Sequence, residues 1–135
     1  MTNPNLARDY FQRAQKRLKA VAVLLDEGAF PDVVRESQEV VELALKGLLR
    51  TFGIAVPFVH DVSDVLTANL SRLPPNMRPL VPRWCEISKQ LRRDRELSFY
   101  GSEDVTPSEF YGRADAESAL AMARELVTGV APSVA

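Results

Sequence analysis

Hydrophobic and polar positions follow helical spacing along most of the chain, and residues 30–53 show the clearest pattern. At about 100° per residue, the apolar side chains of this segment share one broad arc. The arc consists of Val34, Ser37, Val41, Ala44, Leu45, Leu48 and Phe52, and it is widened by Val33 and Val40. Such a wide arc contacts neighbours on more than one side. We therefore predict a central helix here, with Gly53 as a left-handed C-cap.

Four further helices are predicted from spacing and capping signals. They cover residues 4–27 (with Asn3 as N-cap), a segment from Asp61, a segment from 81 or 82 to 97, and a final helix. The final helix begins with the capping box Thr106-Pro107-Ser108-Glu109. Its expected core residues are Phe110, Ala114, Leu120, Ala123, Leu126, Val127 and Val130. Residues 54–59, 74–82 and 98–106 are expected to be loops, and the tail is expected to fray from about residue 131. The predicted fold is a single all-α domain over residues 1–135, an up-and-down bundle of about five helices.

Composition narrows the possible classes of protein. A chain of 135 residues is the size of one domain, and no apolar run reaches the length needed to span a membrane. Cys85 and His60 are the only cysteine and the only histidine, so no intrachain disulfide and no metal-ligand spacing are expected. We expect a cytoplasmic protein with no metal, no cofactor and no membrane association.

Charge is unevenly distributed although the formal net charge is −1. Residues 72–95 hold seven basic and two acidic side chains, whereas residues 96–135 hold two basic and seven acidic ones. The basic stretch can attract an anionic partner such as RNA or a nucleotide phosphate. Alternatively, its charges solvate helix faces or pair with the acidic C-terminal helix, and the pI of about 5.9 favours this second interpretation.

A narrow polar stripe runs along the predicted central helix, where Gln38, Glu42 and Lys46 follow each other at i+4 steps. It is either a solvated face with one ion pair or a stripe that points into a cleft. In a cleft, the carboxylate of Glu42 would orient an arginine of a neighbouring helix. The sequence leaves both interpretations open.

Three arginines, Arg92, Arg93 and Arg95, occur within four residues near the end of the fourth predicted helix. Guanidinium groups match phosphate oxygens, so this cluster can bind phosphate. They can equally pair with Asp94, Glu96 and the acidic residues of 102–104.

Catalysis by a Ser/His/Asp set is not supported, because no strand–turn–helix nucleophile motif surrounds any serine. His60 precedes a helix start, and its simpler role is contact with backbone or core. Cys85 is expected to be packed and not nucleophilic.

Two stretches together resemble the HEPN domain, a small helical bundle common in prokaryotes. The first runs from Gly28 and Phe30 through Gln38, Glu42 and Lys46 to a leucine-rich helix end, and Pro57-x-x-His60-Asp61 is similar to the family's next loop. The second stretch is the late helix end that contains Arg93, Asp94, Ser98 and Tyr100.

The resemblance implies roles for the late stretch. In active HEPN ribonucleases it carries an arginine, a polar residue, a histidine and sometimes a tyrosine; Arg93, Asp94 and Tyr100 match three of these. Ser98 occupies the position of the histidine, and serine is no general base near neutral pH. The resemblance further implies a homodimer with facing late motifs and a partner nucleotidyltransferase, which in some members modifies the tyrosine, here Tyr100.

The leading hypothesis is a HEPN-like domain that binds nucleotide, RNA or a partner protein without full ribonuclease activity, in a toxin–antitoxin-like or stress-defence system. Arg93 and Tyr100 are expected in the cleft, Glu42 and Lys46 as supporting groups, and Arg92 and Arg95 as phosphate contacts. A second hypothesis is a metal-independent ribonuclease that uses Arg93, Tyr100 and His60, with Ser98 in the motif. The third is a plain interaction module without nucleotide contact.

Overall fold

The protein is an all-helical bundle, as predicted. The computed structural model describes the backbone of residues 4–134 and the side chains of residues 5–94 and 100–134. Within residues 4–134 there is no β-strand. The α-helices are α1 (Pro4–Asp26), α2 (Phe30–Thr51), α3 (Ser63–Ala68), α4 (Val81–Tyr100), α5 (Pro107–Phe110) and α6 (Arg113–Val134), with 3₁₀ turns at Leu70–Arg72 and Arg78–Leu80. The predicted N-cap Asn3 lies outside the described residues.

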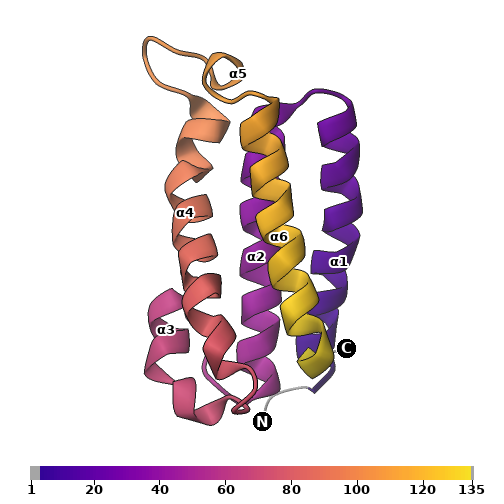
Figure 1. Ribbon diagram of the computed structural model, residues 1–135, viewed down its shortest axis with the longest axis vertical. Helices are drawn as coiled ribbons and strands as arrows, with labels where there is room; N and C mark the ends of the chain where they lie inside the picture. The colour runs from indigo at the N-terminus through magenta and orange to yellow at the C-terminus, as the bar shows by residue number, and fades with distance from the viewer. Residues whose placement is uncertain (1–3, 135) are drawn as a thin grey trace.

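Helix α2 is the centre of the bundle. It packs against α1, α4 and α6, and of these α1 and α4 run antiparallel to it (Figure 1). The residues predicted to share its apolar arc are buried, with the exception of the half-buried Phe52. A Cβ atom at Gly47 would lie 3.1 Å from the carbonyl oxygen of Ala7, so glycine permits the close crossing of α1 and α2. Gly53 has φ +67°, which confirms the predicted left-handed position after the helix.

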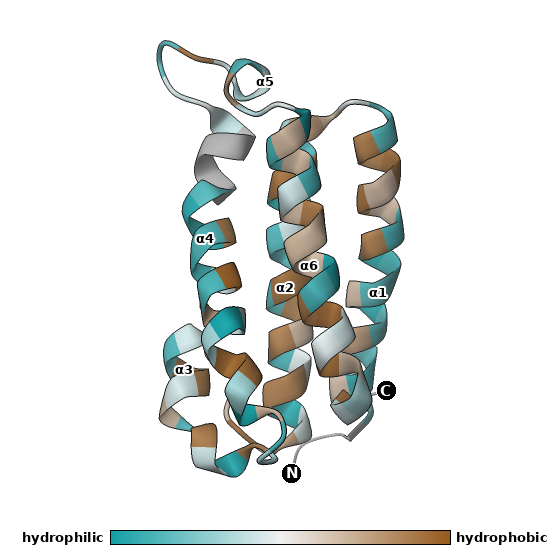
Figure 2. Ribbon diagram, viewed as in Figure 1, coloured by the Kyte–Doolittle hydropathy of each residue, from teal (hydrophilic) through white to brown (hydrophobic). Residues whose placement is uncertain are grey.

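Helix α4 is buried along one side only. Trp84, Ile87 and Leu91 turn towards α2 and α6 and are almost fully buried. In Figure 2 the side of α4 that faces away from the bundle is coloured as hydrophilic along most of its described length. Among the basic residues of α4, Arg83, Lys89 and Arg93 are exposed to solvent.

The chain after α4 differs from the prediction in three places. Helix α4 continues to Tyr100, and the loop starts only at Gly101, which has φ +75°. The predicted capping box at Thr106 is present, but it begins the short α5. A break follows, because Tyr111 is extended and the amide of Gly112 donates to Asp115 Oδ2 at 2.9 Å.

Two residues predicted to be in the core are on the surface. Phe110 is 52% exposed and Ala114 is exposed, whereas Tyr111 is buried. At about 100° per residue, Phe110 and Ala114 lie opposite the face of α6 that buries Ala116, Leu120 and Ala123, so the helical period itself does not place them in the core. The expectation for these two side chains was wrong.

The end of the chain is more ordered than the sequence predicts. Helix α6 continues through Pro132 to Val134, which is buried, so the segment predicted to fray is helical up to the last described residue. Ala135 lies outside the described residues. Among residues 4–134, no helix combines the length and apolar character needed to cross a membrane.

Candidate functional site

The polar stripe of α2 is covered by the chain segment that leads into α3. Gln38 is only 2% exposed, and the side chains of Glu42 and Lys46 are 14% and 15% exposed. The amide nitrogen of Gln38 donates to the backbone carbonyl of His60 across 3.4 Å. The stripe is therefore not a solvated face, and of its two interpretations the structure favours the one that buries it.

Glu42 joins three side chains at the centre of this stripe. One carboxylate oxygen, Oε1, lies 2.7 Å from Nδ1 of His60 and 3.2 Å from the amide nitrogen of Gln38. The other, Oε2, accepts from Nζ of Lys46 at 2.9 Å. Burial disfavours the charged carboxylate, but the hydrogen bonds from His60, Lys46 and Gln38 outweigh it and lower the pKa of Glu42. The side chain is ionised near neutral pH.

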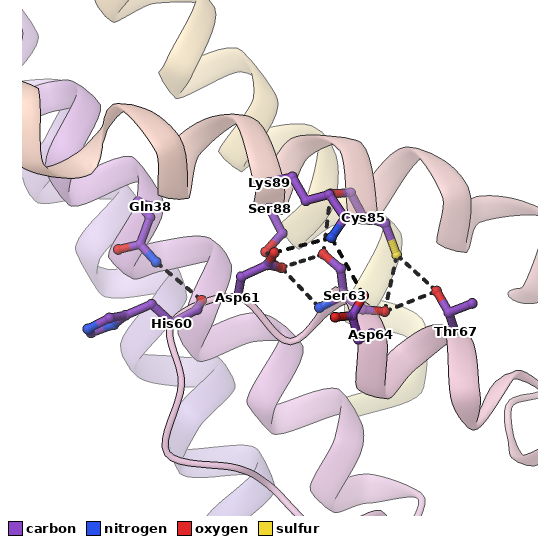
Figure 3. A network of polar contacts seen from close by, with 9 residues as sticks. All are labelled: Gln38, His60, Asp61, Ser63, Asp64, Thr67, Cys85, Ser88 and Lys89. Atoms are coloured by element: carbon purple, nitrogen blue, oxygen red, sulfur yellow. Dashed lines mark hydrogen bonds and ion pairs between the residues drawn. The ribbon is translucent and has the colours of Figure 1, made fainter.

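His60 is held in one orientation by this carboxylate. A carboxylate only accepts hydrogen bonds, so Nδ1 of the imidazole carries the proton that it donates to Glu42. The second ring nitrogen, Nε2, is then the acceptor in the neutral form and a second donor in the charged form. The side chain is 45% exposed, and Figure 3 shows its ring turned away from the Asp61 cluster.

Asp61, the next residue, connects this segment to α3 and α4 (Figure 3). Its carboxylate accepts from the backbone amide of Ser63 at 3.0 Å, from the hydroxyl of Ser63, and from the hydroxyl of Ser88 at 2.8 Å. Nζ of Lys89 lies 3.5 Å from Asp61 Oδ2 and 3.6 Å from Asp64 Oδ1. Burial opposes ionisation of Asp61, but the bonds from Ser63 and Ser88 and the charge of Lys89 lower its pKa.

The predicted start of the third helix is therefore shifted by two residues. Asp61 does accept from a first-turn amide, as expected of a capping side chain, but α3 begins at Ser63. Cys85 lies beside this point and is half-buried. Its sulfur lies 3.6 Å from the carbonyl oxygen of Ser63 and 3.7 Å from the hydroxyl of Thr67.

The basic residues Arg92 and Arg93 follow Ser88 and Lys89 by one helical turn on α4. Neither arginine forms an ion pair with any side chain that the structure describes. Arg83, on the same helix, behaves differently, because it binds Glu125 of α6 at 2.9 Å. Pairing with the acidic C-terminal helix thus accounts for Arg83 but, among the described side chains, not for Arg92 and Arg93.

Asp94 and Tyr100 lie on either side of the part of α4 whose side chains are not described. Burial raises the pKa of Asp94, although the charge of Arg93 opposes the shift. Asp94 lines a pocket of about 150 Å³ together with Tyr111, whose hydroxyl donates to the backbone carbonyl of Asp94 at 3.3 Å. Burial and the nearby Asp94 raise the pKa of Tyr111 to about 12, so this hydroxyl stays protonated. Tyr100 ends α4 and is 74% exposed.

Only some of the predicted site residues lie close together in the structure. Glu42 and Lys46 contact each other, but the described group that the carboxylate orients is the imidazole of His60 and not an arginine. Arg92 and Arg93 lie together on α4, with Tyr100 two turns further on. The side chains of Arg95 and Ser98 lie outside the described residues. Within the described residues, no cluster of three or more His, Cys, Asp or Glu side chains is arranged to hold a metal ion.

The contact of His60 with Glu42 and the contacts of Asp61 with Ser88 and Lys89 were not predicted. His60 and Asp61 reach Glu42 and Ser88 because of the path that the chain takes over residues 52–62. Helical spacing of apolar residues cannot predict the path of such a non-helical segment.

Comparison with known proteins identifies the type of bundle. A family model described as the HEPN domain matches residues 7–131. The crystal structure of TT1696 from Thermus thermophilus has a TM-score of 0.76 and 25% sequence identity, over 96% of this chain and 98% of that chain. The crystal structure of ST0689, an archaeal HEPN homologue, has a TM-score of 0.72 and 22% identity over 100% of both chains. The search of curated proteins gave no match.

Proposed function

Because the chain belongs to the HEPN family, we propose that it is a HEPN domain that binds RNA through α4, without full ribonuclease activity. The observation that supports this most is the state of Arg92 and Arg93, which form no ion pair with a described side chain. A guanidinium group that is not held in an ion pair can meet the phosphate of a ligand, although the charge of Arg93 also acts on the carboxyl of Asp94. Tyr100, exposed at the end of the same helix, adds an aromatic ring for a base.

The proposed assembly is a homodimer in which the α4 ends of two protomers face each other. Such a pairing would bring two copies of Arg93 and Tyr100 to one binding cleft. A nucleotidyltransferase is the proposed partner protein, within a toxin–antitoxin-like or stress-defence system. The exposed hydroxyl-bearing ring of Tyr100 is compatible with modification by such a partner.

RNA binding is tested by fluorescence anisotropy with a labelled single-stranded oligonucleotide. We expect Arg93→Ala to weaken binding about tenfold and to reduce the salt dependence by about one phosphate contact. Arg83→Ala is the matched control, because it removes an arginine of the same helix that already has Glu125 as a partner. Equal affinities of wild type and Arg93→Ala would contradict the proposal and favour the plain interaction module.

A metal-independent ribonuclease is the second candidate, and the exposed imidazole of His60 favours it. Incubation of the protein with single-stranded RNA in EDTA tests this activity. Cleavage that disappears in Arg93→Ala would support the ribonuclease, and intact RNA would exclude it. Sedimentation tests the assembly separately, because a strict monomer at high concentration contradicts the facing α4 ends.

A further inference from the structure

The outer face of α1 carries opposite charges on its two halves. Lys16 and Lys19 are exposed in the middle of the helix, and Asp26 and Glu27 are exposed at its C-terminal end. At about 100° per residue, these four side chains lie within an arc of roughly 120°, opposite the face that α1 buries in the bundle. None of them forms an ion pair with another side chain that the structure describes.

The acidic end of this face is unfavourable for α1 itself. The carbonyl end of a helix carries a partial negative charge, so basic side chains stabilise it and acidic ones do not. Helix α1 has no basic residue in its last turn and ends at Asp26. The amide of Glu27 donates to the carbonyl oxygen of Val23 at 3.0 Å, so Glu27 continues the same turn. A basic group from outside the chain would compensate this end.

The centre of the face is small and apolar. Ala20 is exposed, and Val23 is 58% exposed. Together with Lys16 and Glu27 they follow one another at steps of four, three and four residues. This is the spacing of the seam along which two helices pack side by side.

A groove between α1 and α2 lies beside this centre and has a volume of about 510 Å³. Ala20 and Leu24 give it an apolar side. Of its two acidic residues, Glu36 is bound by Arg17 at 3.0 Å, whereas Asp32 forms no ion pair with a described side chain. The face therefore combines a protruding valine with a groove next to it, as knobs and holes combine in packed helices.

We propose that this face of α1 binds the same face of a second copy of the chain, with the two α1 helices antiparallel about a two-fold axis. In such a contact each surface is its own partner. The register that sets Val23 of each protomer against Ala20 of the other also sets Lys16 against Glu27 of the other. A parallel arrangement would instead bring like charges together.

This contact is independent of the proposed RNA binding. Helices α1 and α4 lie on opposite sides of α2 and α6 (Figure 1). A second copy on α1 therefore leaves the arginines of α4 uncovered, and a contact through the α4 ends can form at the same time.

The contact is short, because residues 16–27 span roughly 17 Å at about 1.5 Å per residue. Interfaces below the standard size are weak, so its strength should depend on the charges. We expect sedimentation velocity to show an association that decreases when the salt concentration is raised from about 0.1 M to about 1 M. Val23→Asp places a charge at the apolar centre and should abolish the association.

Charge reversal tests the antiparallel register. Lys16→Glu brings two acidic side chains together at each end of the contact, and Glu27→Lys brings two basic ones together. Each variant alone should associate about tenfold more weakly than wild type, whereas an equimolar mixture of the two should recover the wild-type association, because every pair is again of opposite charge. Arg124→Glu makes the same change at an exposed position of α6 and is the matched control. Thermal melting verifies that each variant is folded.

The outcomes separate this inference from the proposed function. If Lys16→Glu, Glu27→Lys and Val23→Asp all associate like wild type, the α1 contact is wrong and the association belongs to another surface, such as the α4 ends. A mixture that stays dissociated overturns the antiparallel pairing, and a wild type that remains monomeric in about 0.1 M salt overturns both assemblies. Loss of RNA binding in Arg93→Ala has no bearing on α1.

Discussion

The carboxylate of Asp61 accepts a hydrogen bond from the hydroxyl of Ser88 at 2.8 Å, so the entry to α3 is attached to the middle of α4. Ser88 is almost fully buried, and its hydroxyl has found an ionised acceptor there. A buried hydroxyl without a partner is unfavourable, whereas a bond to a charged group is stronger than one between neutral groups. The pair fixes the small helix α3 against the bundle and thereby sets the position of His60.

Asp61→Ala should lower the free energy of unfolding by about 2 kcal/mol, because it leaves the hydroxyls of Ser63 and Ser88 and one backbone amide without their acceptor. Ser88→Ala removes a single donor and should lower it by about 1 kcal/mol. Urea unfolding followed by circular dichroism measures both. Asp64→Ala is the control, since this carboxylate is exposed and makes only a long contact with Lys89; a loss as large as that of Asp61→Ala would contradict the role of Asp61.

Stability should fall at acid pH through Glu42 and Asp61. Both carboxyls have a pKa below their usual values of 4.5 and 3.8, so the unfolded chain takes up protons first as the pH falls. Their contribution is complete above the unfolded pKa values and disappears as the pH falls through the lower, folded values. Urea midpoints at pH 7 and pH 3 should therefore differ less in Glu42→Gln than in wild type. An equal loss in both proteins would show that Glu42 gains nothing from its three partners.

The sequence predicted the helical scaffold better than the connections between helices. Residues 30–53 have a strong period and clear end signals, and α2 matches them within two residues. The break at Tyr111 and Gly112 was missed because a capping box indicates only where a helix begins. The capping box at Thr106 gives no information on the length of the helix that follows. Phe110 was assigned to the core independently of this break, although the period of α6 places it opposite the buried face.

The site was predictable as far as it lies on one helix. The i+4 spacing of Gln38, Glu42 and Lys46 indicated a stripe, and the structure joins all three through Glu42. The partner of the stripe comes from a segment without periodicity, so neither His60 nor the covering of the stripe followed from the spacing. The expectation that Glu42 orients an arginine assumed that a neighbouring helix would supply the partner, whereas the connecting segment supplies His60.

Gly101→Ala should destabilise the protein by about 1–2 kcal/mol, because residue 101 has φ +75° and a side chain is strained there. Its Cβ would also lie 2.7 Å from the carbonyl oxygen of Val105, which accepts the bond that closes this loop. Thermal melting measures the change. Gly112→Ala is the matched control, since its Cβ would approach nothing closer than 3.9 Å. Comparable losses in the two variants would show that position 101 is not special.

Gly129→Ala tests whether α6 needs a glycine where it crosses the indole of Trp84. Alanine is the better helix former by about 1 kcal/mol, which alone would stabilise α6. However, the new Cβ would lie 3.0 Å from Cζ2 of Trp84, a ring that is almost fully buried and has little room to move. Overpacking in a core lowers stability by about 1–3 kcal/mol, so the clash should exceed the gain and leave a net loss near 1 kcal/mol.

Melting temperature and tryptophan fluorescence together decide this case, because Trp84 is the only tryptophan and reports on its own surroundings. We expect Gly129→Ala to melt at a lower temperature and to shift the emission of the native state. Thr128→Ala, at the preceding exposed position, is the control for helix propensity and should leave the emission unchanged. A variant that melts above wild type with unaltered emission would mean that the indole yields to the methyl group without loss, and that α4 and α6 can separate slightly without affecting the bundle.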